Sequence, residues 1–174
     1  MKAGQSPPFT AEDLELSKKL VPGIQIMRIM VVSSNYFRDP IIDEIPALQM
    51  RVDINSNVNV FVSAERQAWS MITLSIKGVP ISPGPEEKIA FSIETQVEIR
   101  YDAKAVEIPA EDLPRALNAF CHFNSPLHTW SFFRQHIHDA MSRMLLPPID
   151  LPIYPAYEQG VPIPSSKRPR PKKA

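Results

Sequence analysis

Hydrophobic and polar residues alternate over much of the chain between residues 24 and 101. Within residues 48–62 the aliphatic side chains carry even numbers, and within residues 88–101 they carry odd numbers. Residues 69–77 show the same pattern over a shorter stretch. Alternation with period two is typical of a strand that buries one face. Residues 24–36 are apolar at both odd and even positions, which predicts a strand covered on both faces.

Two segments that follow the strands have helical spacing instead. Residues 111–121 predict a short helix, and Ser125 with Pro126 predicts the N-cap and first turn of a longer one. Along the longer helix, large apolar side chains recur every three or four residues, at Trp130, Phe133, Ile137, Met141 and Met144. Pro147 and Pro148 then predict that the helix ends.

The order of these elements predicts an α+β domain. Four consecutive strands favour an antiparallel meander, with the two C-terminal helices packed on one face of this four-stranded sheet. We expect three parts in the chain: an N-terminal extension with a short helix capped by Thr10 (residues 1–22), the folded domain (residues 23–159) and a disordered basic tail (residues 160–174). The length of 174 residues suffices for one domain with a hydrophobic core.

Composition excludes several classes of protein. The formal net charge is zero, so the body as a whole is neither a nucleic-acid nor a membrane surface. No apolar run reaches the roughly 20 residues of a membrane span, and residues 1–16 lack the apolar stretch of a secretory signal. Cys121 is the only cysteine, which excludes an internal disulfide and favours a reducing compartment, the cytoplasm.

Candidate chemistry is sparse. His136 and His138 are two residues apart, on different sides of a helix, and no paired carboxylate or thiol completes a metal site. No Ser-His-Asp, Cys-His or paired-carboxylate arrangement favours an enzyme. No glycine-rich phosphate loop is present for ATP. We therefore expect no catalytic residue, no metal and no cofactor.

The long helix and its exit carry a more specific pattern, F-x-R-x-x-I-x-x-x-x-S-R-x-x-x-P-x-I-x-L. Its residues are Phe132, Arg134, Ile137, Ser142, Arg143, Pro147, Ile149 and Leu151. Shorter matches follow the same order, in the Arg28-Ile29 pair, in residues 52–54 (V-D-I) and in the Phe120-Cys121 pair. Over about residues 24–155 the chain resembles the SecB family of protein-export chaperones.

The resemblance implies a SecB-like fold that assembles as a homo-oligomer, with a dimer of dimers expected. It also implies that unfolded polypeptides are held in apolar grooves without ATP. The expected client-binding residues are Ile24, Met27, Ile29, Val31, Tyr36, Leu146, Ile149, Leu151, Ile153 and Tyr154. The helix residues expected at the oligomer interface are Trp130, Phe133, Ile137 and Met141, with the core as the alternative place for the first two.

The resemblance leaves two clients open, a preprotein for export or an antitoxin. Family members that deliver preproteins to the motor SecA use acidic residues on the first strand, where residues 32–37 here read VSSNYF. SecA binding is therefore not expected. The N-terminal extension and the basic tail are more similar to solitary SecB-like chaperones, including those that protect an antitoxin.

A different class of function is a nucleic-acid or acidic-surface binding module that uses the C-terminal tail. The cations of the tail are Lys167, Arg168, Arg170, Lys172 and Lys173. Such a cluster favours salt-sensitive contacts with phosphate. No aromatic residue is interleaved with them for base stacking, so the sequence favours a solubilising tail over a nucleic-acid partner.

Overall fold

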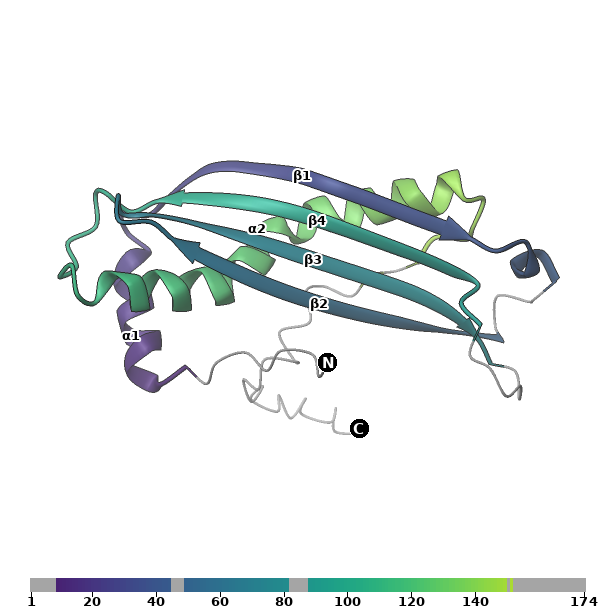
Figure 1. Cartoon of the computed structure of the whole chain (residues 1–174), viewed down its shortest axis with the longest axis horizontal. Helices are drawn as coiled ribbons and strands as arrows, with labels where there is room; N and C mark the ends of the chain where they lie inside the picture. The colour runs from purple at the N-terminus through teal and green to yellow at the C-terminus, as the bar shows by residue number, and fades with distance from the viewer. Residues whose placement is uncertain (1–8, 45–48, 82–87, 150, 152–174) are drawn as a thin grey trace, which may run out of the picture.

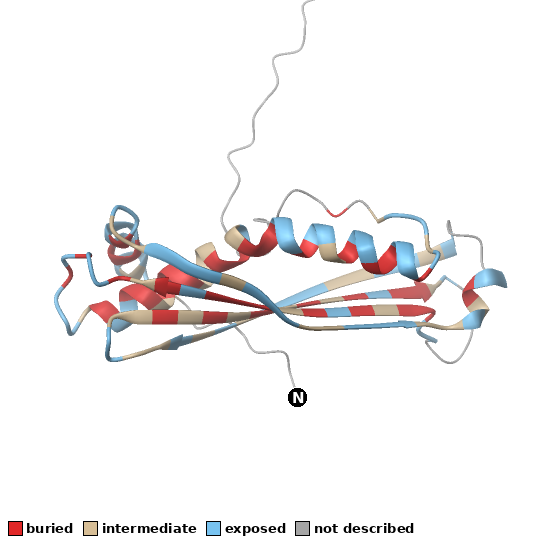
Figure 2. Cartoon of the chain, turned by 90° about the horizontal axis from the view of Figure 1, so that it is seen from above, coloured by how far each residue is buried: buried red, intermediate tan, exposed pale blue. Residues whose placement is uncertain are grey.

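The computed structural model describes residues 9–44, 49–81, 88–149 and 151. The elements in chain order are α1 (Ala11–Leu20), β1 (Gln25–Arg38), the 3-10 helix η1 (Pro40–Glu44), β2 (Met50–Val62), β3 (Gln67–Pro80), β4 (Phe91–Asp102) and α2 (Leu113–Arg143). The four strands form one antiparallel sheet, and both α-helices lie on the same side of it (Figures 1 and 2). The predicted α+β architecture is confirmed.

The order of the strands in the sheet is β1-β4-β3-β2. β2, β3 and β4 form the predicted meander, but β1 pairs with β4 and not with β2, so the expectation of four consecutive neighbours is wrong for β1. β3 and β4 have the most continuous rows of buried side chains. The observed order places these two strands at the centre, where neighbouring strands cover them on both sides, and leaves β1 and β2 at the edges.

β1 contains two β-bulges, at Met27 and at Val32. Each bulge inserts one extra residue and turns the side chains that follow to the other face of the sheet. Simple alternation predicts that Ile26 and Ile29 face opposite ways, whereas both pair with core-facing residues of β4 and share one face. The bulges thus bring Ile26 and Ile29 to one face, while Met30 and Phe37 lie on the other, and most apolar side chains of β1 are exposed.

The two predicted C-terminal helices are one continuous helix, α2, with Pro126 inside it. Ser125, which was expected as an N-cap, is fully buried within this helix. A proline inside a helix lacks the N–H that would bond to the carbonyl four residues earlier, and it bends the helix. α2 bends at its middle and crosses the sheet diagonally, packing on β2, β3 and β4 (Figure 1).

Buried hydrogen bonds tie the bend of α2 to the sheet. Ser125 Oγ donates to Ser70 Oγ of β3 at 2.8 Å, and the Tyr101 hydroxyl of β4 donates to Ser125 Oγ at 3.2 Å. Thr129 Oγ1 donates to the carbonyl of Ser125 at 2.9 Å. Burial raises the pKa of Tyr101 above its usual range, so the phenol stays neutral. These groups satisfy one another in the core, and they hold the bend of α2 against β3 and β4.

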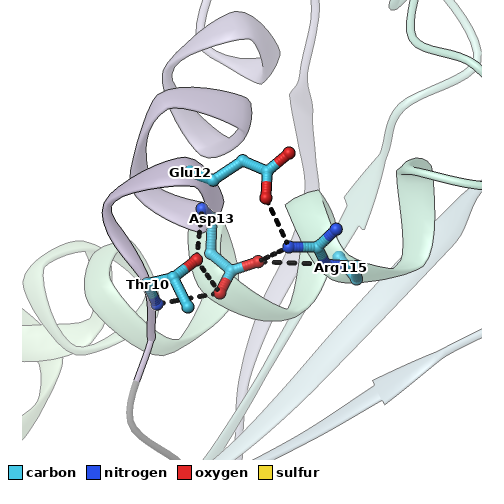
Figure 3. Close-up of polar contacts among 4 residues, drawn as sticks. All are labelled: Thr10, Glu12, Asp13 and Arg115. Atoms are coloured by element: carbon cyan, nitrogen blue, oxygen red, sulfur yellow. Dashed lines mark hydrogen bonds and ion pairs between the residues drawn. The ribbon is translucent and has the colours of Figure 1, made fainter.

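α1 begins with a capping box after Thr10, as the sequence predicts. Thr10 Oγ1 accepts from the N–H of Asp13 at 3.2 Å, and the Asp13 carboxylate accepts from the N–H of Thr10 at 2.9 Å. Arg115 of α2 donates to Asp13 at 2.8 Å and so joins the two helices (Figure 3). Hydrogen bonds from Thr10 and then from Arg115 lower the pKa of Asp13. Leu16 and Leu20 of α1 belong to the same hydrophobic core as α2.

Gly78 of β3 lets a buried aromatic ring lie over the backbone of the neighbouring strand. It is paired across the sheet with Phe91 of β4, whose side chain is 1% exposed. A Cβ atom at position 78 would overlap the ring of Phe91. The position of this ring therefore requires glycine at residue 78.

We predict that Gly78→Ala lowers the free energy of unfolding by about 1–3 kcal/mol, because the buried Phe91 ring has no room to move. The reduced entropy of the unfolded alanine variant offsets only about 0.4–1 kcal/mol of this loss. Urea unfolding followed by circular dichroism measures the difference. Gly78→Ala should lower the free energy of unfolding by less in a Phe91→Leu background than in the parent. An unchanged urea midpoint for Gly78→Ala would contradict this packing.

Candidate functional site

Exposed apolar side chains gather on β1 more than on any other described element. They are Ile26, Met27, Met30, Val31, Val32, Tyr36 and Phe37. Figure 2 shows this strand mostly in the exposed and intermediate colours, in contrast to the buried central strands. Large exposed apolar patches are rare on monomeric proteins and mark interaction sites. β1 is therefore the candidate functional site.

One face of β1 continues the surface of the hydrophobic core. Ile26, Ile29, Val31 and Tyr36 each pair with a core-facing residue of β4, so they point to the side of the sheet on which α2 lies. We name these four residues the β1 ledge. α2 packs on the other three strands, and the ledge stays open, with Ile26 47%, Val31 36% and Tyr36 49% exposed.

The ledge offers apolar side chains beside a strand edge that no other described strand pairs with. Its side chains are uncharged, and Arg38 at the end of the same row is ion-paired with Asp43 of η1. β1 lies at the edge of the sheet, with β4 as its neighbour. An edge strand presents unpaired N–H and C=O groups to which an extended segment can add. The ledge therefore suits an extended apolar polypeptide. Its uncharged side chains would not select a client by charge.

The structure brings together the predicted client-binding residues of β1. Ile29, Val31 and Tyr36 lie in the ledge, and Met27 lies in the first bulge beside it with 59% of its surface exposed. Ile24 precedes β1 and packs partly against the core.

Sequence reasoning missed Ile26 as a member of the ledge. Uninterrupted alternation placed Ile26 on the face opposite Ile29, and the bulge at Met27 reverses that assignment. Bulges are set by the pairing of two strands, and β1 finds its partner, β4, far along the chain. The one hint in the sequence is the loss of strict alternation after residue 26.

Of the five residues after α2 that were expected to bind a client, the structure describes three. Leu151 is 6% exposed and belongs to the hydrophobic core, so its assignment as a client contact is corrected. Leu146 and Ile149 are partly buried against the same core. The other two, Ile153 and Tyr154, lie outside the described residues.

The four helix residues expected at an oligomer interface are covered within one chain. Trp130 is 9% exposed, Phe133 and Ile137 are 1% exposed and Met141 is 2% exposed. All four belong to the core beneath the sheet. Their side chains have little surface left for a second subunit, so the interface assignment is corrected to a core role.

The described part of the chain shows no cluster that would favour metal chemistry, since no three His, Cys, Asp or Glu residues come together there. Cys121 is buried, and burial raises the pKa of its thiol to about 12, which leaves it unreactive at neutral pH. No described helix is long and apolar enough to cross a membrane. The cations of the basic tail lie outside the described residues.

Comparison with solved structures shows a SecB-like fold. The chain is similar to the Mycobacterium tuberculosis SecB-like chaperone Rv1957, solved in complex with a ChAD peptide from the Rv1956 HigA1 antitoxin. The TM-score is 0.63 at 15% sequence identity, and the match covers 79% of this chain and 94% of that chain. At this identity the likeness shows the fold alone.

A protein of unknown function from Streptococcus agalactiae also matches, with 12% identity, a TM-score of 0.25 and coverage of 74% of this chain and 95% of that chain. This likeness is too weak to support an argument. No protein-family model and no curated protein matches the chain.

The different burial of the two parts of the expected site gives a direct test. We predict that Leu151→Asp lowers the free energy of unfolding by at least about 3 kcal/mol, because it buries an unpaired charge in the core. Tyr36→Asp should change the free energy of unfolding by less than about 1 kcal/mol, since the side chain is half exposed on the ledge. Thermal and urea unfolding of the two variants measure both values. Equal losses would show that the ledge is not an open surface.

Proposed function

We propose that the protein is an ATP-independent chaperone that holds non-native polypeptides along the β1 ledge. The observation that supports this function best is the row of exposed apolar side chains on a long edge strand, beside unpaired backbone. A holdase needs such a surface and no catalytic group. Side chains of an extended client would fill the ledge, while its backbone adds to the edge of β1.

Met27 would broaden the range of clients. It is 59% exposed in the first bulge, beside the ledge. Methionine is flexible and polarizable, so it adapts to apolar groups of different shapes. A surface of this kind favours apolar extended segments over one particular sequence.

For the client of this chaperone, we propose a polypeptide that is either an antitoxin or a preprotein. The similar M. tuberculosis chaperone was solved with an antitoxin peptide, which supports the antitoxin. The stretch from Val32 to Phe37 has no acidic residue, which supports an activity that does not pass through SecA. We place this activity in the cytoplasm, because the single cysteine suits a reducing compartment.

We also propose that the protein acts as a homo-oligomer, a dimer or a dimer of dimers. β1 exposes apolar side chains on both of its faces, and its unpaired edge is a template for a strand of a second copy. Pairing of two copies would bury part of this surface and leave the remainder for a client.

For client binding we predict that the double variant Val31→Asp, Tyr36→Asp loses protection of an unfolded client. Each Asp would be desolvated beneath an apolar client side chain, at a cost of about 1–3 kcal/mol, so at least about ten times more protein should be needed. The measurement is light scattering of urea-denatured luciferase diluted into buffer without ATP.

The matched control is Asn57→Asp, Asn59→Asp, which adds the same charge at exposed positions of β2 on the face away from α2. This control should protect luciferase as well as the parent does. Equal protection by the ledge variant and the parent would place client binding elsewhere. A parent that protects no unfolded client would refute the chaperone function itself.

For assembly we predict that multi-angle light scattering at micromolar concentration gives the mass of a dimer or a tetramer. The physical reason is the apolar edge of β1, which no other described element of the chain covers. Met27→Lys introduces a charge at the exposed bulge and should shift the population toward the monomer. A parent that is monomeric across the micromolar range would rule out this assembly.

A further inference from the structure

The face of the sheet that points away from α2 carries a row of arginine and aromatic residues. The strand pairing sets Arg28 of β1 beside Arg100 of β4, Arg100 beside Trp69 of β3, and Trp69 beside Phe61 of β2. The four side chains therefore form one line across all four strands, which we name the outer row. No described element covers this face of the sheet (Figure 2).

The charge of the outer row is not balanced. Like charges directly opposite each other on a sheet are destabilising, and here Glu98 holds the two guanidinium groups together. Its Oε1 accepts from Arg28 Nη2 at 2.7 Å and from Arg100 Nε at 2.7 Å. The side chain of Glu98 is 11% exposed, whereas those of Arg28 and Arg100 are 47% and 51% exposed. One carboxylate thus faces two arginines, and the excess positive charge lies toward solvent.

The charged residue that follows Arg100 on this face of β4 does not cancel the excess. Asp102, the next outward residue of β4 after Arg100, has a side chain that is 17% exposed and lies 3.7 Å from Lys104 Nζ. Its negative charge is matched by that lysine. Hydrogen bonds from Arg100 and then Arg28 lower the pKa of Glu98, so the trio keeps its net positive charge at neutral pH.

The aromatic half of the outer row supplies an apolar anchor beside these charges. The rings of Phe61 and Trp69 stack with centroids 5.5 Å apart and an interplanar angle of 15°. Phe61 is 46% exposed. Met71 lies next to Trp69 along β3 on the same face. Arginine, aromatic residues and methionine are the residues enriched in the cores of protein–protein interfaces.

We propose that the outer row binds an acidic polypeptide segment that carries an apolar residue next to its carboxylates. The two guanidinium groups would donate charge-assisted hydrogen bonds to the carboxylates, and the apolar residue would pack on Phe61 and Trp69. This site is on the opposite face of the sheet from the β1 ledge, so a partner bound here would leave the client surface accessible.

Single-stranded nucleic acid is the competing ligand for arginine and aromatic side chains, and the geometry favours it less. Binding of bases depends on ring faces that are free to stack, whereas Phe61 and Trp69 already stack on each other. Binding along a nucleic-acid backbone also depends on several cations spaced along it, whereas the outer row holds two arginines at one point, partly neutralised by Glu98.

Fluorescence anisotropy with the full chain tests this site. The probe is a short labelled peptide of alternating glutamate, serine and leucine. A second peptide with glutamine in place of glutamate and a labelled oligo-dT of similar length serve for comparison. The parent should bind the glutamate peptide most tightly. Arg28→Gln should weaken that binding by about tenfold, the effect of losing one charge-assisted hydrogen bond. Glu98 keeps Arg100 as its partner, so the fold should persist.

The matched control is Lys77→Gln, which removes one positive charge from an exposed position on the same face, far from the outer row. It should change the affinity for the glutamate peptide less than twofold. Equal losses in the two variants, equal binding of the glutamine peptide, or tighter binding of oligo-dT would each overturn the assignment. A change of oligomeric mass in Arg28→Gln would also overturn it, because the row would then join two copies of the chain.

Arg28→Gln should protect luciferase as well as the parent does. The two proposals can therefore fail independently. Peptide affinity tests the outer row, and luciferase protection by the ledge variant tests the chaperone function. Loss of luciferase protection in Arg28→Gln would mean that the client itself lies on the outer row, which contradicts a separate partner site.

Discussion

A single layer of helix covers one face of a four-stranded sheet and leaves the other face uncovered among the described residues. This one-sided cover determines which surfaces remain open. α2 lies diagonally on β2, β3 and β4, so the buried rows of β3 and β4 form the core. The same geometry leaves β1 and the entire outer face without a covering layer among the described residues. In most domains of this class every apolar strand face is buried within the chain. Here the exposed apolar and arginine residues occupy the places that the helix does not reach.

A small polar cluster of Ser125, Ser70 and Tyr101 lies at the bend of α2, in an otherwise apolar core. The sequence alone predicts that a new helix begins at the proline at position 126. The mutual hydrogen bonds of the cluster hold the two halves of α2 on one sheet surface. Buried polar groups that are fully paired add specificity more than raw stability, and in this chain they specify where the covering helix bends.

Local patterns in the sequence predict most of the fold. The period-two rows of residues 48–62 and 88–101 gave β2 and β4, and Thr10 gave the cap of α1, because these features depend on neighbours within a few residues. The patterns gave wrong predictions where contacts between residues far apart in the sequence determine the structure. The pairing of β1 with β4, the bulge that moves Ile26, and the burial of Leu151 all depend on residues far along the chain. The apolar residues of β1 could be predicted as part of the site from the sequence. For Leu151, the sequence could not distinguish an exposed position from a core position.

The position of β1 in the sheet also has a consequence for the order of folding. β2, β3 and β4 are joined by short connections and pair with their neighbours in sequence, whereas Arg28 meets Glu98 across 70 residues. Closing so long a loop is entropically costly until the central strands are in place. During synthesis β1 is made before β4, so we expect its apolar side chains to stay without a partner strand until β4 is complete. We therefore expect the strand that we assign to holding unfolded chains to be the last strand to join the sheet.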